Sequence, residues 1–330
     1  SIKWQRVWVT QKGWQKSSPS WLLMRPIIYA AAYLPAKNIG DILMRLGIVG
    51  MLPGDFRTHT DEHFEAISKL GFTGAGFHFP GHLSGEITPS DIQHCISRFS
   101  RHNIDLVQFA ITYPECLFHP DQAIRETVID KIKMGTQVAS DLSAPYCLIR
   151  PGSLNPSGSW TPHRDNHTPE AWHQLIETLQ HITPTLEQLG VVAVMETHLV
   201  SILRNPESCR QMVETLGSSH MRLVMDYVNH FETLQHVYNS QERLDHIFTE
   251  MGAYAPVLHI KDISLGKGLV LHIEETVPDN GELDLVHCFQ QFQNLYPDAY
   301  GLIEHLPVDQ IPEANTNTRA IAAQAGVPIV

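Results

Sequence analysis

The feature that most restricts the fold of this sequence is a regular alternation of short apolar runs with longer segments of helical periodicity, beginning near residue 45. Eight such runs, rich in β-branched residues, predict strands at 46–52, 74–79, 104–111, 145–150, 191–196, 222–228, 256–260 and 300–304. The segments between and after them predict helices at 61–70, 89–99, 121–142, 169–189, 206–216, 241–251, 284–294 and 312–325. Because parallel strands are joined by crossover helices, this alternation predicts an α/β fold with a parallel sheet.

The number of units predicts a closed barrel rather than an open sheet. Eight βα units in about 280 residues match a (β/α)8 TIM barrel. An open doubly wound sheet is the alternative, but no G-x-G-x-x-G follows the first strand, since Gly47, Gly50 and Gly54 do not have that spacing. We therefore expect a TIM barrel over residues 45–330, preceded by an N-terminal extension over residues 1–44.

The first forty residues differ in composition from the rest of the chain. They contain six basic residues and no acidic one, together with four of the six tryptophans. A transit peptide is one reading of a basic, acid-free start, although its apolar stretches are too short for a clear secretory signal. We favour an extension that docks outside the barrel or an artefact of the gene start, with Met24 and Met44 as alternative start sites.

Composition excludes several classes of function. The formal net charge of −12 argues against nucleic acid as a partner, because phosphate binding needs a positive surface. No run of eighteen apolar residues is present, so we expect no transmembrane helix. The five cysteines are scattered and form no C-x-x-C, which predicts free thiols in a reducing compartment and a cytoplasmic location. The sequence is compatible with a homo-oligomer as well as with a monomer.

Polar residues at four successive strand ends predict a metal site. Strands buried on both faces are otherwise apolar, and the active site of a TIM barrel lies at the carboxyl ends of its strands. The fifth to eighth predicted strands end at or near the potential ligands Glu196, Asp226, His259 and Glu304, each about one βα unit after the last. Buried carboxylates at adjacent strand ends would repel one another without a cation between them. Three carboxylates and one imidazole suit one divalent ion, namely Mn²⁺, Mg²⁺ or Co²⁺, with Zn²⁺ as a further candidate.

These strand ends resemble those of the xylose isomerase-like TIM-barrel superfamily of sugar phosphate isomerases and epimerases, which also contains endonuclease IV. The resemblance covers about residues 45–326. It depends on Met-Glu196-Thr-His, Val-Met-Asp226-Tyr-Val-Asn, Leu-His259-Ile-Lys-Asp and Leu-Ile-Glu304-His, and on Val-Pro-Asp-Asn-Gly-Glu-Leu-Asp at 277–284. It implies a metal-dependent isomerase or epimerase that acts on a small sugar or a related hydroxy-ketone.

The resemblance also implies catalytic roles for Glu196 and Glu304. In the ketose epimerases of this family, Glu, Asp, His and Glu on strands five to eight hold one divalent metal, and the two glutamates exchange the substrate proton. One abstracts it beside the carbonyl, and the other returns it on the opposite face. A metal that polarises the carbonyl and two flanking carboxylates make chemical sense of a reaction through an enediolate.

Further polar residues near these strand ends are candidates for binding the substrate. The long loop after the fourth predicted strand contributes Arg150, which could bind a carboxylate or phosphate, and Trp160, which could stack on a sugar face. His198 and Lys261 each lie two residues beyond a predicted ligand, hence on the same side of an extended chain. His78 ends the second strand.

Asn229 marks a departure from the family's pattern. The epimerases have a D-x-x-H sequence that begins at the metal-binding Asp. Here the position three residues after Asp226 is Asn229, and His230 comes one residue later. Asn can hydrogen-bond a sugar hydroxyl, but it cannot act as a base. An inosose-type dehydratase or other lyase therefore remains an alternative, because it shares the first half-reaction. An endonuclease IV-like repair enzyme is disfavoured by the missing histidines and the charge, and a non-catalytic ligand-binding barrel by the intact ligand set.

Overall fold

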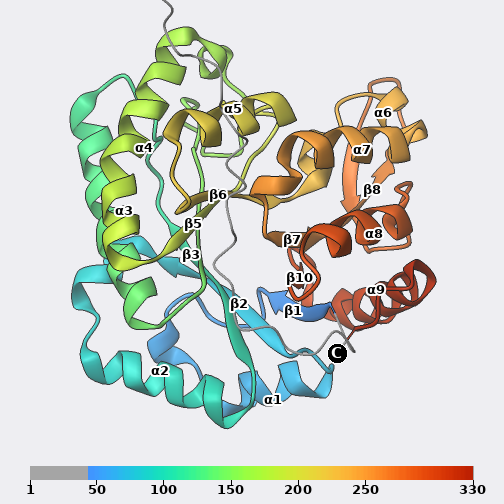
Figure 1. Ribbon diagram of the computed structural model, residues 1–330, viewed down its shortest axis with the longest axis horizontal. Helices are drawn as coiled ribbons and strands as arrows, with labels where there is room; N and C mark the ends of the chain where they lie inside the picture. Colours follow the sequence, from blue (N-terminus) through green and yellow to red (C-terminus); the bar gives the residue numbers. More distant parts are fainter. Residues whose placement is uncertain (1–43, 330) are drawn as a thin grey trace, which may run out of the picture. The chain divides into compact units, whose positions relative to one another are not determined.

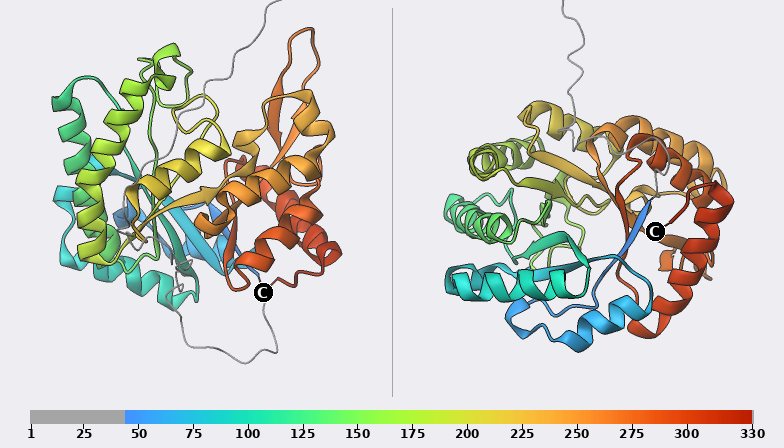
Figure 2. Two further views of the ribbon diagram at one scale, coloured as in Figure 1. Left: turned by 45° about the horizontal axis from the view of Figure 1, so that its top comes forward. Right: turned by 60° about the horizontal axis from the view of Figure 1, so that its bottom comes forward.

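Eight parallel strands close into a barrel within residues 44–329, which are those that this computed structural model describes. Around the barrel the order is β1, β10, β7, β6, β5, β4, β3 and β2, and an outer layer of helices surrounds the strands (Figure 1; Figure 2, right). The barrel strands are β1 (Arg45–Val49), β2 (Gly74–Pro80), β3 (Asp105–Thr112), β4 (Tyr146–Ile149), β5 (Val192–Met195), β6 (Met221–Met225), β7 (Val257–Ile260) and β10 (Tyr300–Ile303). Each overlaps one predicted run, so the expected TIM barrel is confirmed.

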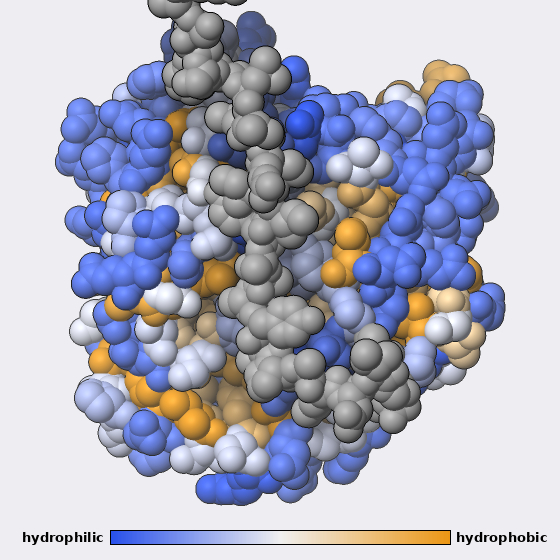
Figure 3. Space-filling model, in the orientation of Figure 1, coloured by the Kyte–Doolittle hydropathy of each residue, from blue (hydrophilic) through white to orange (hydrophobic). Residues whose placement is uncertain are grey.

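The helices begin and end where local sequence signals place them. Thr88 and Asp91 form a capping box at the start of α2 (Pro89–Arg101), and Thr168 caps α4 (Pro169–Leu189) while Pro169 occupies its first turn. Gly190 ends α4 in a left-handed conformation, which glycine adopts without steric cost. The helices are α1 (Asp61–Lys69), α2 (Pro89–Arg101), α3 (Gln122–Asp141), α4 (Pro169–Leu189), α5 (Pro206–Leu216), α6 (Leu234–Tyr238), α7 (Ser240–Met251), α8 (Leu285–Leu295) and α9 (Ile311–Ala325). On the face seen in Figure 3, mainly hydrophilic residues cover the outer sides of the helices.

Two apolar layers line the barrel strands, and successive residues of a strand belong to different layers except in β3, where the pairing register with β2 shifts. One layer fills the barrel interior, with Val194 of β5, Val224 of β6, Val257 of β7 and Leu302 of β10 among its members. The other lies between the strands and the helices. Since alternate residues of a strand point to the same side, the interior positions that follow these four residues are 196, 226, 259 and 304. The alternation therefore directs the predicted ligands toward the barrel axis.

Some elements near the site differ from the sequence prediction. A two-stranded antiparallel hairpin, β8 (Asp262–Leu265) and β9 (Ile273–Thr276), rises beyond β7 (Figure 2, left). Its strands are short and partly polar, so apolar runs could not reveal them. The sixth strand ends at Met225 rather than at 228, because the chain turns into a 3₁₀ helix, η4 (Tyr227–His230). Tyr227 anchors that turn by donating a hydrogen bond to the carbonyl of Lys261 at 2.5 Å.

The expected extension lies outside the described residues except for Met44. Met44 is fully buried, and its N–H donates to the carbonyl of Pro328 at 3.0 Å. Among the described residues, none of the helices has both the length and the apolar character needed to cross a bilayer.

We propose that the barrel is an autonomous domain, since residues 44–329 complete its strand pairing on their own. A protein shortened to residues 42–330 should fold and bind Mn²⁺ with the affinity of the full chain. Circular dichroism and calorimetric titration measure both properties. A shortened protein that folds but has lost the metal would place part of the site in the first 41 residues.

His59 should make the barrel less stable in mild acid. Its ring is 1% exposed, lies 5.0 Å from the ring of Phe77, and has Nε2 2.9 Å from the carbonyl oxygen of Pro53. Burial lowers its pKa to about 4, against 6.5 for a free histidine. The unfolded chain therefore takes up the proton first, and stability present above pH 6.5 is lost as the pH falls toward 4. By pH 5 the loss should be about 2 kcal/mol.

Urea unfolding at pH 8 and pH 5 tests this expectation. His59→Phe should lose about 2 kcal/mol less than the wild type between these pH values. His94→Gln is the matched control, because it replaces a histidine that lies exposed on α2. Equal losses in the wild type and His59→Phe would show that His59 is not responsible.

Candidate active site

Four predicted ligands converge at the carboxyl ends of adjacent strands. Glu196 follows β5, Asp226 follows β6, His259 lies in β7 and Glu304 follows β10. Each is buried and offers one ligand atom, and these four atoms all lie within 4.8 Å of one another. His259 Nδ1 lies 2.8 Å from Glu304 Oε1 and 3.5 Å from Asp226 Oδ2. The fold thus brings these four residues together in one compact cluster of three carboxylates and one imidazole.

The three carboxylates of this cluster differ in their affinity for protons. Burial and the charge of Glu304 raise the pKa of Glu196 to about 7. For Asp226, burial raises the pKa, but Lys261 and His259 outweigh it and bring the pKa to about 2. Burial likewise opposes the ionised form of Glu304, yet His259 and Lys261 hold its pKa well below 4.5. Asp226 and Glu304 are therefore ionised, whereas Glu196 is poised between its two forms near neutral pH.

The cluster has the donor atoms and the charge that a divalent cation requires. Within the described part of the chain, Asp226 Oδ1 and Glu304 Oε2 are buried without a hydrogen bond. Buried acceptors of this kind are costly unless something compensates them. Burial lowers the pKa of His259, but the charges of Glu304 and Asp226 outweigh it and raise that pKa to about 9. One divalent cation held by Glu196, Asp226, His259 and Glu304 would take the place of the proton on His259 and balance the carboxylates.

Lys261 lies directly beside the cluster. Its Nζ is 2.6 Å from Asp226 Oδ2 and 3.1 Å from both Glu304 Oε1 and His305 Nδ1. The side chain is almost fully buried. Because Lys261 contacts one oxygen of each carboxylate, the second oxygen of each stays free for a metal or a substrate.

Trp160, His198 and Arg150 form a group near this cluster. The Trp160 ring is 41% exposed, and its centroid lies 5.2 Å from that of His198. The Arg150 guanidinium lies 5.7 Å from the Trp160 ring centroid, and its Nη2 donates to the carbonyl of Tyr113 at 2.9 Å. Arg150 is thus held in place by protein contacts, while Trp160 stays partly exposed. Burial lowers the pKa of His198, and the nearby charge of Asp226 opposes that effect.

The structure places His78 and Asn229 differently with respect to the ligands. Burial lowers the pKa of His78, and the charge of Glu304 opposes it, so this ring lies within electrostatic range of the cluster. Asn229 instead supports the end of β5, because its Nδ2 donates to the carbonyl of Thr197 at 3.1 Å. Asn229, which stands where the family's pattern has a histidine, therefore makes a hydrogen bond within the protein that the sequence did not reveal.

Three residues near the cluster were missed by the sequence prediction. Gln108 of β3 is fully buried, and its Oε1 lies 2.9 Å from His259 Nε2. It could have been found as a polar residue inside an otherwise apolar run. His305 has a positive φ of 61° and lies 3.7 Å from Glu275 of the hairpin. No sequence signal indicated Glu275, because the hairpin that brings it to the site was not predicted.

The hairpin is tied to the barrel through Asp262. Its carboxylate accepts hydrogen bonds from the N–H groups of Asp279, Gly281 and Leu283 at 3.1, 3.1 and 3.3 Å. These donors lie in the 277–284 segment that carried part of the family resemblance. The segment therefore has a structural role, which is to hold β8 and the loop before α8 against each other.

Gly281→Ala should destabilise this junction, since an added Cβ would collide with the Asp262 carboxylate and the Ile263 carbonyl. The expected loss in the free energy of unfolding is about 1–3 kcal/mol, with faster hydrogen exchange in the hairpin. Gly85→Ala is the matched control, because a Cβ at Gly85 would meet no atom within 4 Å. Equal stability of the two variants would show that the junction tolerates the added methyl group.

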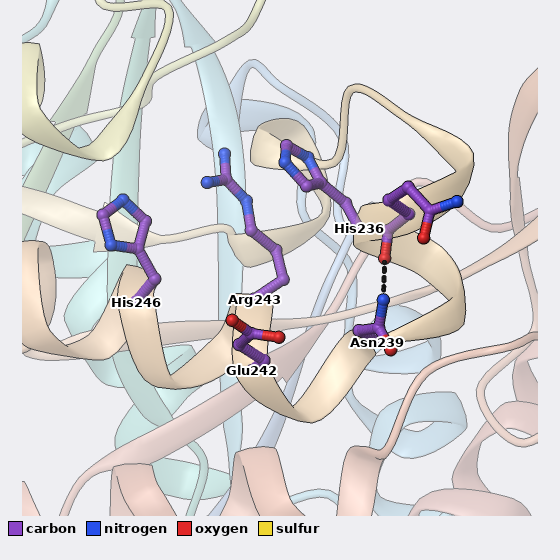
Figure 4. Close-up of a pocket in the computed structure, with 6 residues that line it drawn as sticks. His236, Asn239, Glu242, Arg243 and His246 are labelled. Atoms are coloured by element: carbon purple, nitrogen blue, oxygen red, sulfur yellow. Dashed lines mark hydrogen bonds between the residues drawn. The ribbon is translucent and has the colours of Figure 1, made fainter.

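A separate hollow of about 340 Å³ lies over α6 and α7 (Figure 4). Polar side chains line it, and none of the four clustered ligands is among them. Arg243 connects this hollow to the turn that follows Asp226, because its Nε and Nη2 donate to the carbonyl of His230 at 3.0 and 2.6 Å. That carbonyl ends η4, the turn that directly follows Asp226.

The chain belongs to the xylose isomerase-like TIM barrel family, whose model matches residues 64–321. No curated protein matches the sequence. Among solved structures, it is similar in fold to the 3-keto-D-glucoside 4-epimerase YcjR of E. coli, with a TM-score of 0.63 and 14% identity over 85% of this chain and 99% of that one. For a D-psicose 3-epimerase of Clostridium cellulolyticum H10, solved with D-tagatose, the TM-score is 0.63 and the sequence identity is 13%, over 87% of this chain and 100% of that one. For a xylose isomerase-like TIM barrel protein of Mycobacterium smegmatis in complex with magnesium, the TM-score is 0.65 and the sequence identity is 12%, over 86% of this chain and 96% of that one.

Proposed function

We propose that this protein is a divalent-metal-dependent isomerase or epimerase of a small sugar or related hydroxy-ketone, acting by proton transfer through an enediolate. The observation that carries the proposal is the buried cluster of Glu196, Asp226, His259 and Glu304 at the carboxyl ends of four adjacent strands. Membership of the family and the sugar epimerases among its structural neighbours support the same class of reaction.

Glu196 and Glu304 are proposed as the groups that move the substrate proton. They follow β5 and β10, which are separated in the barrel by β6 and β7, so they can approach a planar intermediate from different sides. One carboxylate removes the proton from the carbon beside the carbonyl, and the other returns a proton to it. Their different proton affinities suit this exchange, because an acid and a base of one reaction need unlike environments. A bound divalent cation would polarise the carbonyl and stabilise the negative charge of the intermediate.

We propose Mn²⁺, Mg²⁺ or Co²⁺ as the metal, with Zn²⁺ as the further candidate. Carboxylate-rich sites favour the first three, and the magnesium complex of the M. smegmatis neighbour agrees with such a choice. Calorimetric titration of metal-stripped protein with each ion, followed by elemental analysis, would rank them.

The substrate is proposed to bind between the cluster and the group formed by Trp160, His198 and Arg150. The partly exposed ring of Trp160 is proposed to stack on the apolar side of a sugar ring. Lys261 and His198 supply polar groups for hydroxyl or carbonyl oxygens, and His78 contributes from β2. Asn229 orients the end of β5 and has one amide oxygen left for a substrate hydroxyl.

A lyase or dehydratase of the inosose type is the second candidate. It would begin with the same proton removal and end with loss of a hydroxyl group as water. His305 favours this alternative as a proton donor to the leaving hydroxyl, because its Nε2 lies 3.6 Å from Glu304 Oε1. Burial opposes the charged form of this ring, but the contacts with Glu275 and Glu304 outweigh burial and raise its pKa. An endonuclease IV-like activity fits less well, because Asn229 replaces a histidine of that site and the chain is acidic.

Turnover of a substrate panel by the Mn²⁺-loaded protein tests the proposal. The panel contains free ketoses, inososes and hydroxypyruvate, and the products are identified by mass and by NMR. A product of unchanged mass supports the isomerase or epimerase, whereas a product lighter by one water supports the dehydratase. No turnover of any panel member by fully metal-loaded protein would count against both.

A further inference from the structure

We propose that Gln108 is a positioning residue that fixes the tautomer and ring orientation of His259, so that Nδ1 is the nitrogen that binds the metal. Nothing in the family resemblance or in the strand-end pattern assigned a role to this residue. The inference rests on the proposed metal centre, and the experiment below separates failure of the one from failure of the other.

Gln108 reaches His259 across the barrel. It belongs to β3, whereas His259 belongs to β7, and these two strands are separated by β4, β5 and β6. Both side chains are fully buried. Gln108 Oε1 lies 2.9 Å from His259 Nε2, and the opposite ring nitrogen, Nδ1, lies 2.8 Å from Glu304 Oε1 and 3.5 Å from Asp226 Oδ2. The imidazole therefore spans the distance from the glutamine to the carboxylates.

The contact between Gln108 and His259 decides which nitrogen of the imidazole carries the hydrogen when a metal is bound. A neutral imidazole has one N–H and one lone pair, and a metal takes the lone pair. If Nδ1 binds the metal, Nε2 must carry the hydrogen, and a buried N–H needs an acceptor. Gln108 Oε1 is that acceptor. Nδ1 lies 2.8 Å from Glu304 Oε1 and so carries a hydrogen toward that carboxylate when no cation is bound, and a bound metal would take the place of this hydrogen. An amide turned the other way would occupy the lone pair of Nε2 and keep the hydrogen on Nδ1, where the metal would bind.

The surroundings of Gln108 show that this contact is its main interaction. Its Nε2 is buried and makes no hydrogen bond within the described part of the chain, so no second partner fixes the amide. An unpaired buried amide donor costs about 1–3 kcal/mol, which a purely apolar residue at this position would avoid. Apolar residues such as Val107 and Ala110 of the same strand already fill the neighbouring interior positions. A glutamine is thus explained by the acceptor that it offers to His259.

Metal affinity measured on variants tests the proposal. Gln108→Leu removes the acceptor at similar volume and should weaken Co²⁺ binding by about 10–100-fold in calorimetric titration, with a changed Co²⁺ visible absorption spectrum. Gln108→Glu keeps an acceptor at the same place and should retain most of the affinity. Asn315→Leu is the matched control, because Asn315 is a buried amide in α9 whose Nδ2 donates to the carbonyl of Leu70. It should cost stability without changing Co²⁺ affinity.

NMR of the wild type provides a test that needs no variant. In Zn²⁺-loaded protein labelled with ¹⁵N at histidine, the metal-bound ring should carry its hydrogen on Nε2. A hydrogen on Nδ1 would overturn the proposal, and so would wild-type Co²⁺ affinity in Gln108→Leu or an equal loss in Gln108→Leu and Gln108→Glu. Failure of the wild type to bind any of these metals would instead contradict the proposed metal centre itself.

Discussion

Asp226→Asn should bind Mn²⁺ at least about 100-fold more weakly than the wild type, because it loses a charged ligand, and even residues that only support a ligand are worth 10–100-fold. The substitution keeps the shape of the side chain but removes one of the three carboxylate charges in the cluster. It also leaves Lys261 without the ion pair that its Nζ makes at 2.6 Å. Calorimetric titration of metal-stripped protein measures the affinity directly.

The control for this prediction is Asp245→Asn. Asp245 lies on α7, its side chain is 53% exposed, and it pairs with His287 away from the cluster. The two variants make the same chemical change, so only the location differs. Circular dichroism should show that both remain folded. Wild-type affinity in folded Asp226→Asn would remove Asp226 from the metal centre.

Glu196→Gln and Glu304→Gln should each lower kcat by about 10²–10⁴-fold even when excess Mn²⁺ restores the metal, because general acid–base help is typically worth that much. Each glutamate is also a proposed ligand, so kcat has to be measured together with the metal content of the same sample. Both variants keep an oxygen for the metal but lose the group that accepts or returns the proton. The free enzyme and the loaded enzyme therefore give different information, and only the loaded one tests catalysis.

Glu275→Gln is the matched control for the two glutamate variants. Glu275 lies on β9 with a side chain 39% exposed, 3.9 Å from Lys261 Nζ, and we assign it no role in proton transfer. Its replacement should change kcat by less than the other two do. Near-full activity in metal-loaded Glu196→Gln or Glu304→Gln would exclude that residue from the proton transfer.

The barrel and the convergence of Glu196, Asp226, His259 and Glu304 could be predicted because both depend on local sequence patterns. Alternation of apolar runs and helical segments identified the eight barrel strands. Within those strands, period two placed Glu196 after Val194 and Asp226 after Val224 on the interior side. Parallel strands bring their carboxyl ends to one edge of the sheet, so the position of the four residues at successive strand ends was enough to predict a cluster that spans more than one hundred residues of sequence.

Contacts that depend on tertiary packing could not be predicted. The hairpin that carries Glu275 has strands of mixed polarity, and its position depends on bonds between Asp262 and a loop. The contact between Gln108 and His259 joins residues 151 positions apart across the barrel, where no spacing rule applies. Asn229 was noted only as a missing histidine, although its bond to Thr197 depends on the turn of η4.

Incorporation of solvent deuterium during turnover is the most direct test of the central claim that this site moves a proton in a metal-dependent reaction. The substrate is the one that the panel identifies, and the reaction is run in deuterated water with Mn²⁺-loaded and with metal-stripped protein. We expect deuterium at the carbon beside the carbonyl with the loaded protein and neither turnover nor exchange with the stripped one. Turnover without any deuterium in the product would point to a hydride shift, and full turnover by metal-stripped protein would show that no metal is needed; either result would contradict the proposed mechanism.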